Sequence, residues 1–178
     1  MTHADISDVL LSREQISEAV KRMAHQIEED YPKELPLMVG ILKGSFIFMA
    51  DLVRQMQRPF EMDFLRLSSY GSGVDSSGKV RLRMGVTRPV RDRDVLLVED
   101  IVDTGLTTSY AVGYLQRKRA GSVKLCALLD KPSHRQTQVA PDYVGFTIPD
   151  KFVVGYGLDF DEQYRHLPDI HVLKKGQL

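Results

Sequence analysis

The sequence predicts an α/β protein in which a twisted, mainly parallel sheet is flanked by helices. Short apolar runs rich in Val, Ile and Leu alternate with segments of helical spacing, a pattern typical of parallel strands joined by helices. One pair of partly alternating segments interrupts this order and indicates an antiparallel hairpin. The 178 residues show no internal repeat and no long linker, so we expect a single domain spanning 1–178.

The first elements have clear start and stop signals. Ser12 followed by Gln15 is a capping box, and apolar residues then recur at helical spacing until the Tyr-Pro pair at 31–32 ends the helix. Residues 36–42 are apolar and predict a short strand. A Lys-Gly-Ser break follows it, and a helix is predicted over 46–55.

The hairpin is predicted from strands over 61–67 and 80–86, where polar and apolar side chains partly alternate. The segment between them, Ser68–Lys79, is rich in Gly and Ser, so packing cannot hold it in one shape. It is either a floppy hairpin tip or a lid that closes over a reaction centre sensitive to water. Composition alone favours the hairpin tip, and the lid is the functional alternative.

The stretch Val95–Tyr110, VLLVEDIVDTGLTTSY, is the centre of the chain. Its apolar start suits a strand covered on both faces, and Glu99 and Asp100 follow where that strand should end. A turn over 103–107 is rich in small and hydroxyl residues, and a helix is predicted over 108–118. Such a strand, turn and helix start gather backbone N–H groups at one point, which suits a phosphate.

The acids beside this turn restrict the ligand. Glu99, Asp100 and Asp103 would repel a bare phosphate. A ribose 5-phosphate derivative with magnesium instead offers a phosphate to the turn, and hydroxyls or a cation to the acids. The alternative is a buried strand followed by solvated acids, which are favoured at any helix N-terminus. The pattern alone does not choose between the two.

The C-terminal part predicts strands over 122–129, 143–148 and 171–173. Lys131 follows the first of these strands, at the edge where open α/β sheets bind ligands, although most lysines in turns are simply exposed. Phe152 lies among Val residues, which is more typical of a core than of a binding platform. We expect the N- and C-terminal segments to form a small hood over the strand ends.

Composition argues against several classes of protein. The 24 basic and 24 acidic side chains cancel, so no global field recruits nucleic acid or an anionic membrane. The start MTHADISDVL lacks the pattern of a signal peptide, and no stretch is long and apolar enough to span a bilayer. The lone Cys126 lies in an apolar run and indicates a buried thiol. We therefore expect a cytoplasmic protein.

The motif VEDIVDTGLT resembles the phosphoribosyl-pyrophosphate signature of the type I phosphoribosyltransferases, in which two acids precede a hydrophobic pair and an Asp-Thr-Gly-x-Thr turn. More narrowly, the chain is similar to the hypoxanthine-guanine phosphoribosyltransferases. Four further segments carry this resemblance: LKGSFIFMADL at 42–52, RLSSYGS at 66–72, LLDKPSHR at 128–135 and PDKFVVGYGLDFDEQYRHLP at 149–168. The resemblance implies the type I phosphoribosyltransferase fold, with a small hood and a flexible antiparallel hairpin lid.

The resemblance also implies three groups of binding residues. Those for the phosphoribosyl group and its phosphate are Glu99, Asp100, Asp103, Thr104, Gly105, Leu106 and Thr107. Those for pyrophosphate are Lys43, Gly44, Ser69, Tyr70 and Arg165. Those for the purine are Lys131, Phe152, Val153 and Asp159. Some relatives carry Lys where this chain has Leu106, a departure that affects only the affinity for phosphate.

The implied activity is purine salvage. The 5-phosphoribosyl group would pass from 5-phosphoribosyl 1-pyrophosphate to hypoxanthine, guanine or both, giving IMP or GMP and pyrophosphate. Glu99, Asp100 and Asp159 would hold Mg²⁺, and Asp103 would act as the general base. Lys131 would donate to the exocyclic oxygen of a 6-oxopurine, which distinguishes such a base from adenine.

Two alternatives stay open at this stage. One is a regulator that keeps the fold but binds nucleic acid, which would be expected to show a basic face or an added DNA-binding segment. The other is a transferase for a different base, such as xanthine. The sequence does not set the preference between hypoxanthine and guanine. Association into a homodimer or homotetramer is implied only by the resemblance.

Overall fold

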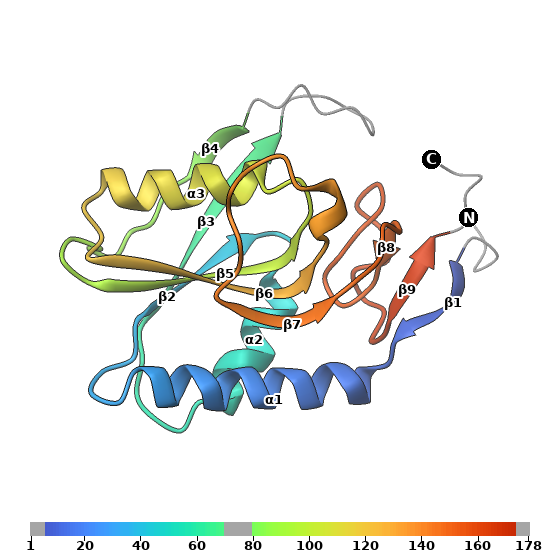
Figure 1. Ribbon diagram of the computed structural model, residues 1–178, viewed down its shortest axis with the longest axis horizontal. Coiled ribbons are helices and arrows are strands. Elements are labelled where there is room, and N and C mark those ends of the chain that lie inside the picture. The colour runs from blue at the N-terminus through green and yellow to red at the C-terminus, as the bar shows by residue number, and fades with distance from the viewer. Residues whose placement is uncertain (1–5, 70–79, 174–178) are drawn as a thin grey trace.

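The computed structural model describes residues 6–69 and 80–173, which form two sheets and the helices that cover the larger one (Figure 1). In chain order the elements are β1 (Ile6–Leu11), α1 (Arg13–Asp30), β2 (Leu37–Leu42), α2 (Phe46–Gln55), β3 (Met62–Ser69), β4 (Val80–Met84), β5 (Asp94–Val102), α3 (Leu106–Arg117), β6 (Ser122–Asp130), the 3-10 helix η2 (Pro132–His134), β7 (Tyr143–Thr147), β8 (Val153–Val154) and β9 (Ile170–Leu173). Within these residues, no helix combines the length and the apolar character needed to cross a membrane.

The larger sheet has the strand order β4-β3-β2-β5-β6-β7. Neighbouring strands from β3 to β7 in this order are parallel, and β4 pairs with β3 in the antiparallel sense. The predicted mainly parallel sheet with one antiparallel hairpin is therefore confirmed. After β2, the chain adds β3 on one side of that strand and then β5 on the other. The topological switch point therefore lies between β2 and β5, and sheets of this kind bind ligands at such a point.

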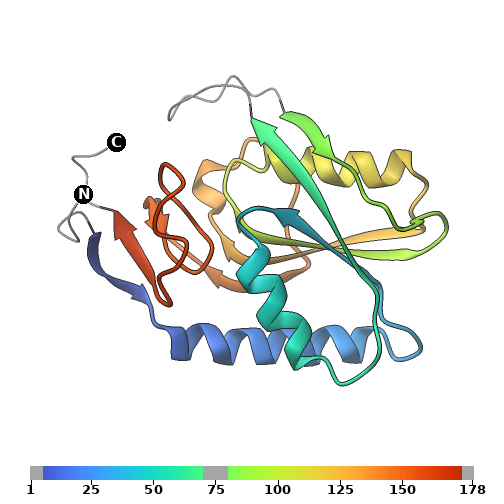
Figure 2. The ribbon, with the colours of Figure 1, turned by 180° about the vertical axis from the view of Figure 1, so that it is seen from behind.

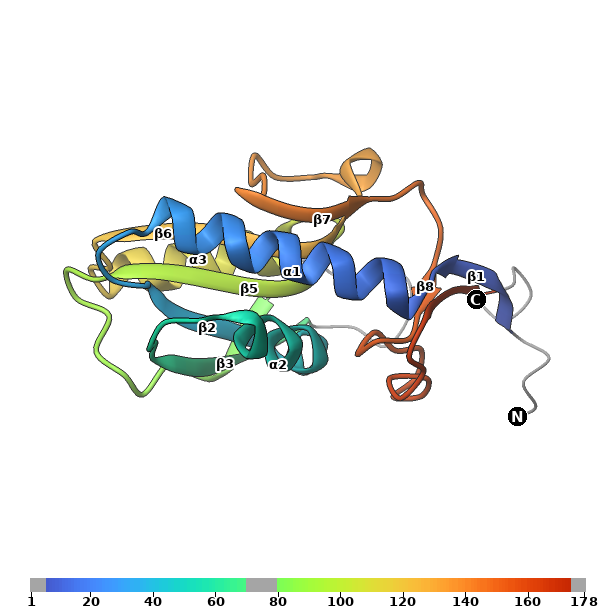
Figure 3. The same cartoon turned by 90° about the horizontal axis from the view of Figure 1, so that it is seen from below.

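Helices cover both faces of the larger sheet. The pair α1 and α2 packs on one face, and α3 packs on the other (Figures 1 and 3). Alternate residues of β5 serve the two cores: Leu96 and Val98 join the core beneath α1 and α2, whereas Val95 and Leu97 join the core beneath α3. Packing on both faces holds the C-terminal end of β5 in place.

The smaller sheet forms the hood that the sequence predicts. Its order is β1-β9-β8, with β9 antiparallel to both neighbours. The first described strand and the last one therefore lie side by side at one end of the molecule (Figure 2). The sequence did not predict β1 or β8 as strands: β8 has only two residues, and both depend on pairing with the distant strand β9.

Two predicted boundaries on either side of the central turn are wrong. Glu99 and Asp100 lie inside β5 and not after its end, because β5 continues to pair with β6 as far as Val102. The following helix begins at Leu106, two residues before its predicted start. Gly105 explains the earlier start, since its left-handed backbone, with φ 79°, forms the helix cap.

The predicted start of α1 is confirmed. The backbone N–H of Gln15 donates to Ser12 Oγ at 3.4 Å, and the backbone N–H of Ser12 donates to Gln15 Oε1 at 2.9 Å. The hairpin strands are also present as β3 and β4. The segment predicted as a hairpin tip or lid lies mostly outside the described residues, which resume at Val80.

Candidate active site

A cavity of about 330 Å³ lies between the C-terminal ends of β5 and β6 and the hood. Its walls are Glu99, Asp100, Ile101, Asp103, Thr104, Gly105, Thr107, Thr108, Lys131, Lys151, Phe152, Val153, Leu158 and Asp159. Most residues that the sequence assigned to the phosphoribosyl group and the purine therefore meet in one place. We call it the base-side cavity.

Two buried carboxyls form its floor. Glu99 and Asp100 are each 7% exposed. Burial raises the pKa of both groups, and the charge and hydrogen bond of Asp100 raise the pKa of Glu99 further. Glu99 Oε2 is buried without a hydrogen-bond partner among the described residues. Because buried polar atoms are normally satisfied, this oxygen is available to a ligand hydroxyl or a cation.

The turn after β5 is held open by a glycine and an arginine. A side chain at Gly105 would run into Thr137 and Arg135. Arg135 braces the turn from outside, because its Nε donates to the Asp103 carbonyl at 3.1 Å and its Nη2 donates to the Val102 carbonyl at 3.2 Å. Helix α3 then begins without a side-chain cap hydrogen bond. The N–H of Leu106 donates to Thr104 Oγ1 at 3.4 Å, and the N–H groups that follow it in the first turn can bind a phosphate.

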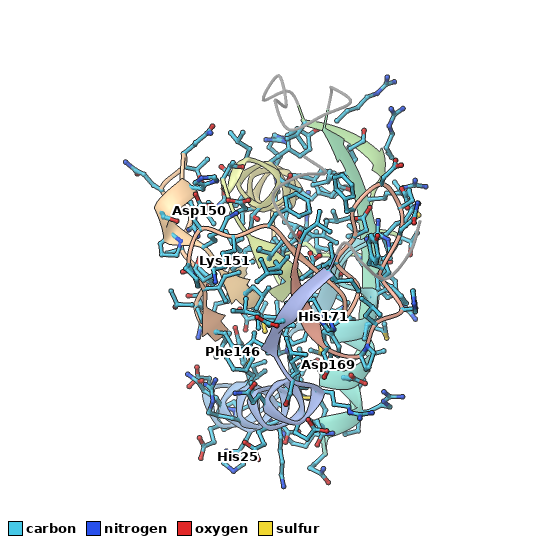
Figure 4. All side chains as sticks on the ribbon, turned by 90° about the vertical axis from the view of Figure 1, so that its right-hand side faces the viewer. His25, Phe146, Asp150, Lys151, Asp169 and His171 are labelled. Atoms are coloured by element: carbon cyan, nitrogen blue, oxygen red, sulfur yellow. The ribbon has the colours of Figure 1, made fainter. Side chains whose placement is uncertain are left out.

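Lys131 is buried in the wall of this cavity, which excludes its interpretation as an exposed turn residue. The whole residue is only 5% exposed. Its Nζ lies 2.9 Å from Asp103 Oδ2 and 3.4 Å from Asp150 Oδ1. Asp150 was not predicted as a site residue, and Figure 4 shows it beside Lys151 on the loop after β7. The two carboxylates fix the ammonium and balance its charge.

Phe152 and Val153 form the hood side of the same cavity. Val153 begins β8 and is buried, whereas Phe152 is 36% exposed. Phe152 packs edge-on against Phe160, with the ring centroids 5.6 Å apart and the planes at 87°. The interpretation of Phe152 as a core residue is therefore wrong, because Val153 is buried in the core and Phe152 is not.

A second cavity of about 690 Å³ adjoins the first and shares Thr107 and Asp159 with it. We call it the pyrophosphate-side cavity. Its lining is rich in cations and consists of Lys43, Arg66, Leu67, Ser68, Arg83, Thr107, Asp159, Glu162 and Arg165. A cation-rich space next to the turn over 103–107 suits a polyanion.

An exposed acid connects the cations of the pyrophosphate-side cavity. Glu162 Oε2 lies 2.8 Å from Lys43 Nζ and 3.3 Å from Arg165 Nη2. Arg165 also pairs with Asp159 Oδ1 at 2.8 Å and donates to the Gly157 carbonyl at 2.7 Å. The two predicted pyrophosphate-binding cations are thus held together before any ligand is bound.

Gly44 lines neither cavity but lies against Asp100 of the first one. The peptide bond between Leu42 and Lys43 is cis, and Gly44 follows it directly against the floor of the site. A Cβ at Gly44 would overlap the carboxylate of Asp100, and a Cβ at Gly157 would meet the Gly44 carbonyl. The loop after β2 therefore requires glycine because backbone, acid and hood loop approach so closely.

Some predicted residues lie elsewhere. Leu106 is the first residue of α3 and lines neither cavity. Ser69 is the last residue of β3, and Tyr70 lies outside the described residues. The site also contains residues that the sequence reasoning missed, namely Arg66, Arg83, Arg135, Asp150 and Glu162. The alternation of β4 was the available signal for Arg83, which donates to Ser68 Oγ at 2.9 Å.

The donor set fits magnesium only together with a phosphorylated ligand. Within the described residues, no cluster of three or more His, Cys, Asp or Glu side chains is arranged to hold a metal ion. Mg²⁺ commonly takes one or two carboxylates and completes its shell with water and phosphate oxygens. Glu99, with its unpartnered oxygen, and Asp159, which lines both cavities, supply such a partial set.

Comparison with known proteins agrees with this site. The family model of the phosphoribosyl transferase domain matches residues 8–161, which sets the class of protein that the turn, the acids and the cavities define. The hypoxanthine-guanine phosphoribosyltransferase of Bacillus subtilis is 47% identical over 174 residues, covering 98% of this chain and 97% of that protein. The enzyme of the same name from Streptococcus pneumoniae is 47% identical over 98% of this chain and 97% of its own length.

A solved structure is also similar to this chain. The crystal structure of a hypoxanthine-guanine phosphoribosyltransferase from Bacillus anthracis superposes with a TM-score of 0.90 at 42% identity, covering 96% of this chain and 100% of that one. The chain belongs to the hypoxanthine-guanine phosphoribosyltransferase family. The resemblance read from the sequence motifs, and the fold it implied, are thereby confirmed.

Proposed function

We propose that this chain transfers the 5-phosphoribosyl group of 5-phosphoribosyl 1-pyrophosphate to hypoxanthine, guanine or both, and releases pyrophosphate. The observation that carries the proposal is the buried ammonium of Lys131 in the wall of the base-side cavity. Two carboxylates engage it, so a third N–H is available to the exocyclic oxygen of a 6-oxopurine. The exocyclic amino group of adenine does not accept such a bond, and Phe152 offers the purine a ring to stack on.

The sugar phosphate would lie in the turn over 103–107. The N–H groups there and the start of α3 bind the 5-phosphate, while Glu99 and Asp100 accept hydrogen bonds from the ribose hydroxyls. Fixing the phosphate and the hydroxyls together places the anomeric carbon in reach of the purine nitrogen. Binding energy is thereby converted into orientation.

The pyrophosphate would occupy the neighbouring cavity. Lys43 and Arg165 are its protein cations, with the Gly44 backbone and the predicted contributions of Ser69 and Tyr70 beside them. Glu99, Asp100 and Asp159 would hold magnesium, which when bound offsets the charge that develops on the leaving pyrophosphate. Asp103 is the proposed general base for the purine imidazole nitrogen.

A single assay tests this function. Purified protein is supplied with 5-phosphoribosyl 1-pyrophosphate and Mg²⁺, and pyrophosphate release is measured with hypoxanthine, guanine, xanthine and adenine in turn. We expect release with hypoxanthine or guanine and none with adenine. Adenine as the sole productive base would overturn the role of Lys131, and no release with any base would overturn the function.

We propose further that the enzyme is cytoplasmic, needs no nucleic-acid or membrane partner, and forms a homodimer or homotetramer. The support for association is the resemblance to the family, whose members are usually dimers or tetramers. Light scattering during gel filtration measures the oligomer directly. A monomer at micromolar concentration would contradict this proposal and leave the transferase activity untouched.

A further inference from the structure

His134 lies beside the predicted general base but has no part in the mechanism described above. It belongs to η2, and its imidazole bridges two carboxylates: Nε2 lies 2.8 Å from Asp150 Oδ2, and Nδ1 lies 3.4 Å from Asp103 Oδ1. Lys131 bridges the same two carboxylates from its own side. The four side chains therefore close a ring in which acids and bases alternate.

The ring sets the tautomer of the imidazole. A carboxylate only accepts hydrogen bonds, so the short contact to Asp150 requires a hydrogen on Nε2 of His134. In the neutral ring Nδ1 then carries the lone pair, and it faces Asp103. Asp103 Oδ1 is buried without a hydrogen-bond partner among the described residues, while Oδ2 of the same carboxylate pairs with Lys131. Two acceptors that face each other in this way are suited to sharing one proton.

We propose that His134 relays the proton of the purine from Asp103 to solvent. This inference rests on the proposed function. As the purine nitrogen bonds to the anomeric carbon, the bond from that carbon to pyrophosphate breaks. The N–H bond of the purine breaks as well, and an O–H bond forms on the Asp103 carboxylate. That O–H bond then breaks and an N–H bond forms on Nδ1 of His134, which restores the carboxylate and leaves an imidazolium between two acids.

Exposure and charge both favour this route. The side chain of His134 is 48% exposed, whereas Asp103 Oδ1 is buried, so the imidazolium can pass its proton to water or buffer. Imidazole is in general a stronger base than a carboxylate. The ion-pair contacts of His134 are to Asp103 and Asp150, which also engage Lys131, whereas Arg135 is directed to backbone carbonyls and to Asp130. His134 therefore acts through Asp103 and is a positioning residue, not a catalytic one.

The test compares His134→Ala and His134→Gln with Ser133→Ala, an exposed neighbour on η2 that serves as the matched control. Nucleotide formation is measured over many turnovers, because the relay restores the Asp103 carboxylate only after each bond exchange, and the first turnover alone should stay near the wild-type rate. We expect both His134 variants to react about tenfold more slowly or worse, while the affinity for 5-phosphoribosyl 1-pyrophosphate stays within about twofold. Imidazole added to the buffer should restore much of the lost rate, because it can replace the relay.

Each outcome assigns His134 either to the proton relay or to a purely structural role. A wild-type rate in His134→Ala overturns the proposal, and so does a slow rate that imidazole does not raise, because that result assigns His134 a purely structural role. Rescue of both His134 variants, with no effect of imidazole on Ser133→Ala, supports the relay. Failure of the proposed function is recognised separately, since the wild-type protein would then form no nucleotide in the same assay.

Discussion

The two adjoining cavities are built in different ways. The base-side cavity is formed by strand ends and buried groups: Glu99, Asp100 and Lys131 are all less than 10% exposed. The pyrophosphate-side cavity depends on exposed groups, and the side chains of its Lys43 and Glu162 ion pair are 45% and 65% exposed. The first is preorganised, which suits the proposed recognition of a base and a sugar, whereas the second holds its cations in exposed ion pairs that the proposed polyanion would displace.

The largest expected effect lies in the base-side cavity. Asp103→Asn keeps the shape of the side chain but removes its capacity to take a proton. We expect kcat to fall by about 10²–10⁴-fold, while binding of 5-phosphoribosyl 1-pyrophosphate weakens far less, because the turn is held by its backbone and by Arg135. Steady-state kinetics with hypoxanthine measure both quantities. Unchanged turnover would remove Asp103 from the role of general base. Asp161→Asn, at an exposed acid of the C-terminal loop, is the control.

Gly44→Ala tests the close approach of the loop after β2 to Asp100. The added methyl group would overlap the Asp100 carboxylate, so either the loop after β2 or the acid must move. We expect kcat/KM for 5-phosphoribosyl 1-pyrophosphate to fall by about 10²-fold, the typical result of a displacement near 1 Å. A loss of less than threefold would show that the loop adapts freely.

The control for this variant is Gly113→Ala in the interior of α3. A methyl group there meets only the end of the Arg117 side chain. Helix propensity favours Ala over Gly by about 0.5–1 kcal/mol, so this variant should be as stable as the wild type or more stable, with unchanged activity. The pair of variants separates the effect of the close approach at Gly44 from the general effect of adding a methyl group.

The base-side cavity could largely be predicted from the sequence, because its residues follow strands with strong local signals. The apolar start of β5 predicts a buried strand, and the following acids and Gly105 occur within a few positions of one another. Burial of Lys131 could not be predicted, since a lysine in a turn is usually exposed. Its burial depends on Asp150, which the fold brings from a separate loop.

Sequence reasoning missed more of the pyrophosphate-side cavity because its contacts join distant segments. Lys43 and Glu162 are 119 positions apart, and neither residue type alone indicates the pairing. The hood shows the same limit: β8 has two residues, too few for a periodic pattern, and exists only through its pairing with β9. Local patterns fixed the elements, and long-range pairing decided which side chains meet.

Glu99→Gln tests the burial of charge in the base-side cavity through the melting temperature of the protein. The folded-state pKa of Glu99 is raised above its ordinary value of 4.5 by burial, so the folded state holds a proton that the unfolded state releases. The stability contribution is therefore present below pH 4.5 and is lost as the pH rises through the raised pKa. We expect the metal-free variant to melt higher than the wild type, by about 2–4 °C for each kcal/mol gained, with a difference that grows across this window.

Calorimetry with and without the substrate separates the destabilising effect of burying Glu99 from its role in ligand binding. Without ligand, a variant less stable than the wild type at neutral pH would show that Glu99 is stabilised by partners in the site. With 5-phosphoribosyl 1-pyrophosphate and Mg²⁺, the wild type should gain more stability than the variant, because ligand binding to the folded state raises its melting temperature. Equal gains would remove Glu99 from the ligand-binding set.

The smallest expected effect is in the pyrophosphate-side cavity. Glu162→Gln removes the acid that competes with pyrophosphate for Lys43 and Arg165. Since exposed ion pairs are weak, inhibition by pyrophosphate should become tighter by no more than about fivefold, and the gain should shrink as salt is added. Glu14→Gln, which breaks a similarly exposed pair with Arg13 on α1, should leave the inhibition constant unchanged. Weaker inhibition in Glu162→Gln would mean that Glu162 positions the cations for pyrophosphate, and the contrast between a preorganised cavity and a displaceable one would then fail.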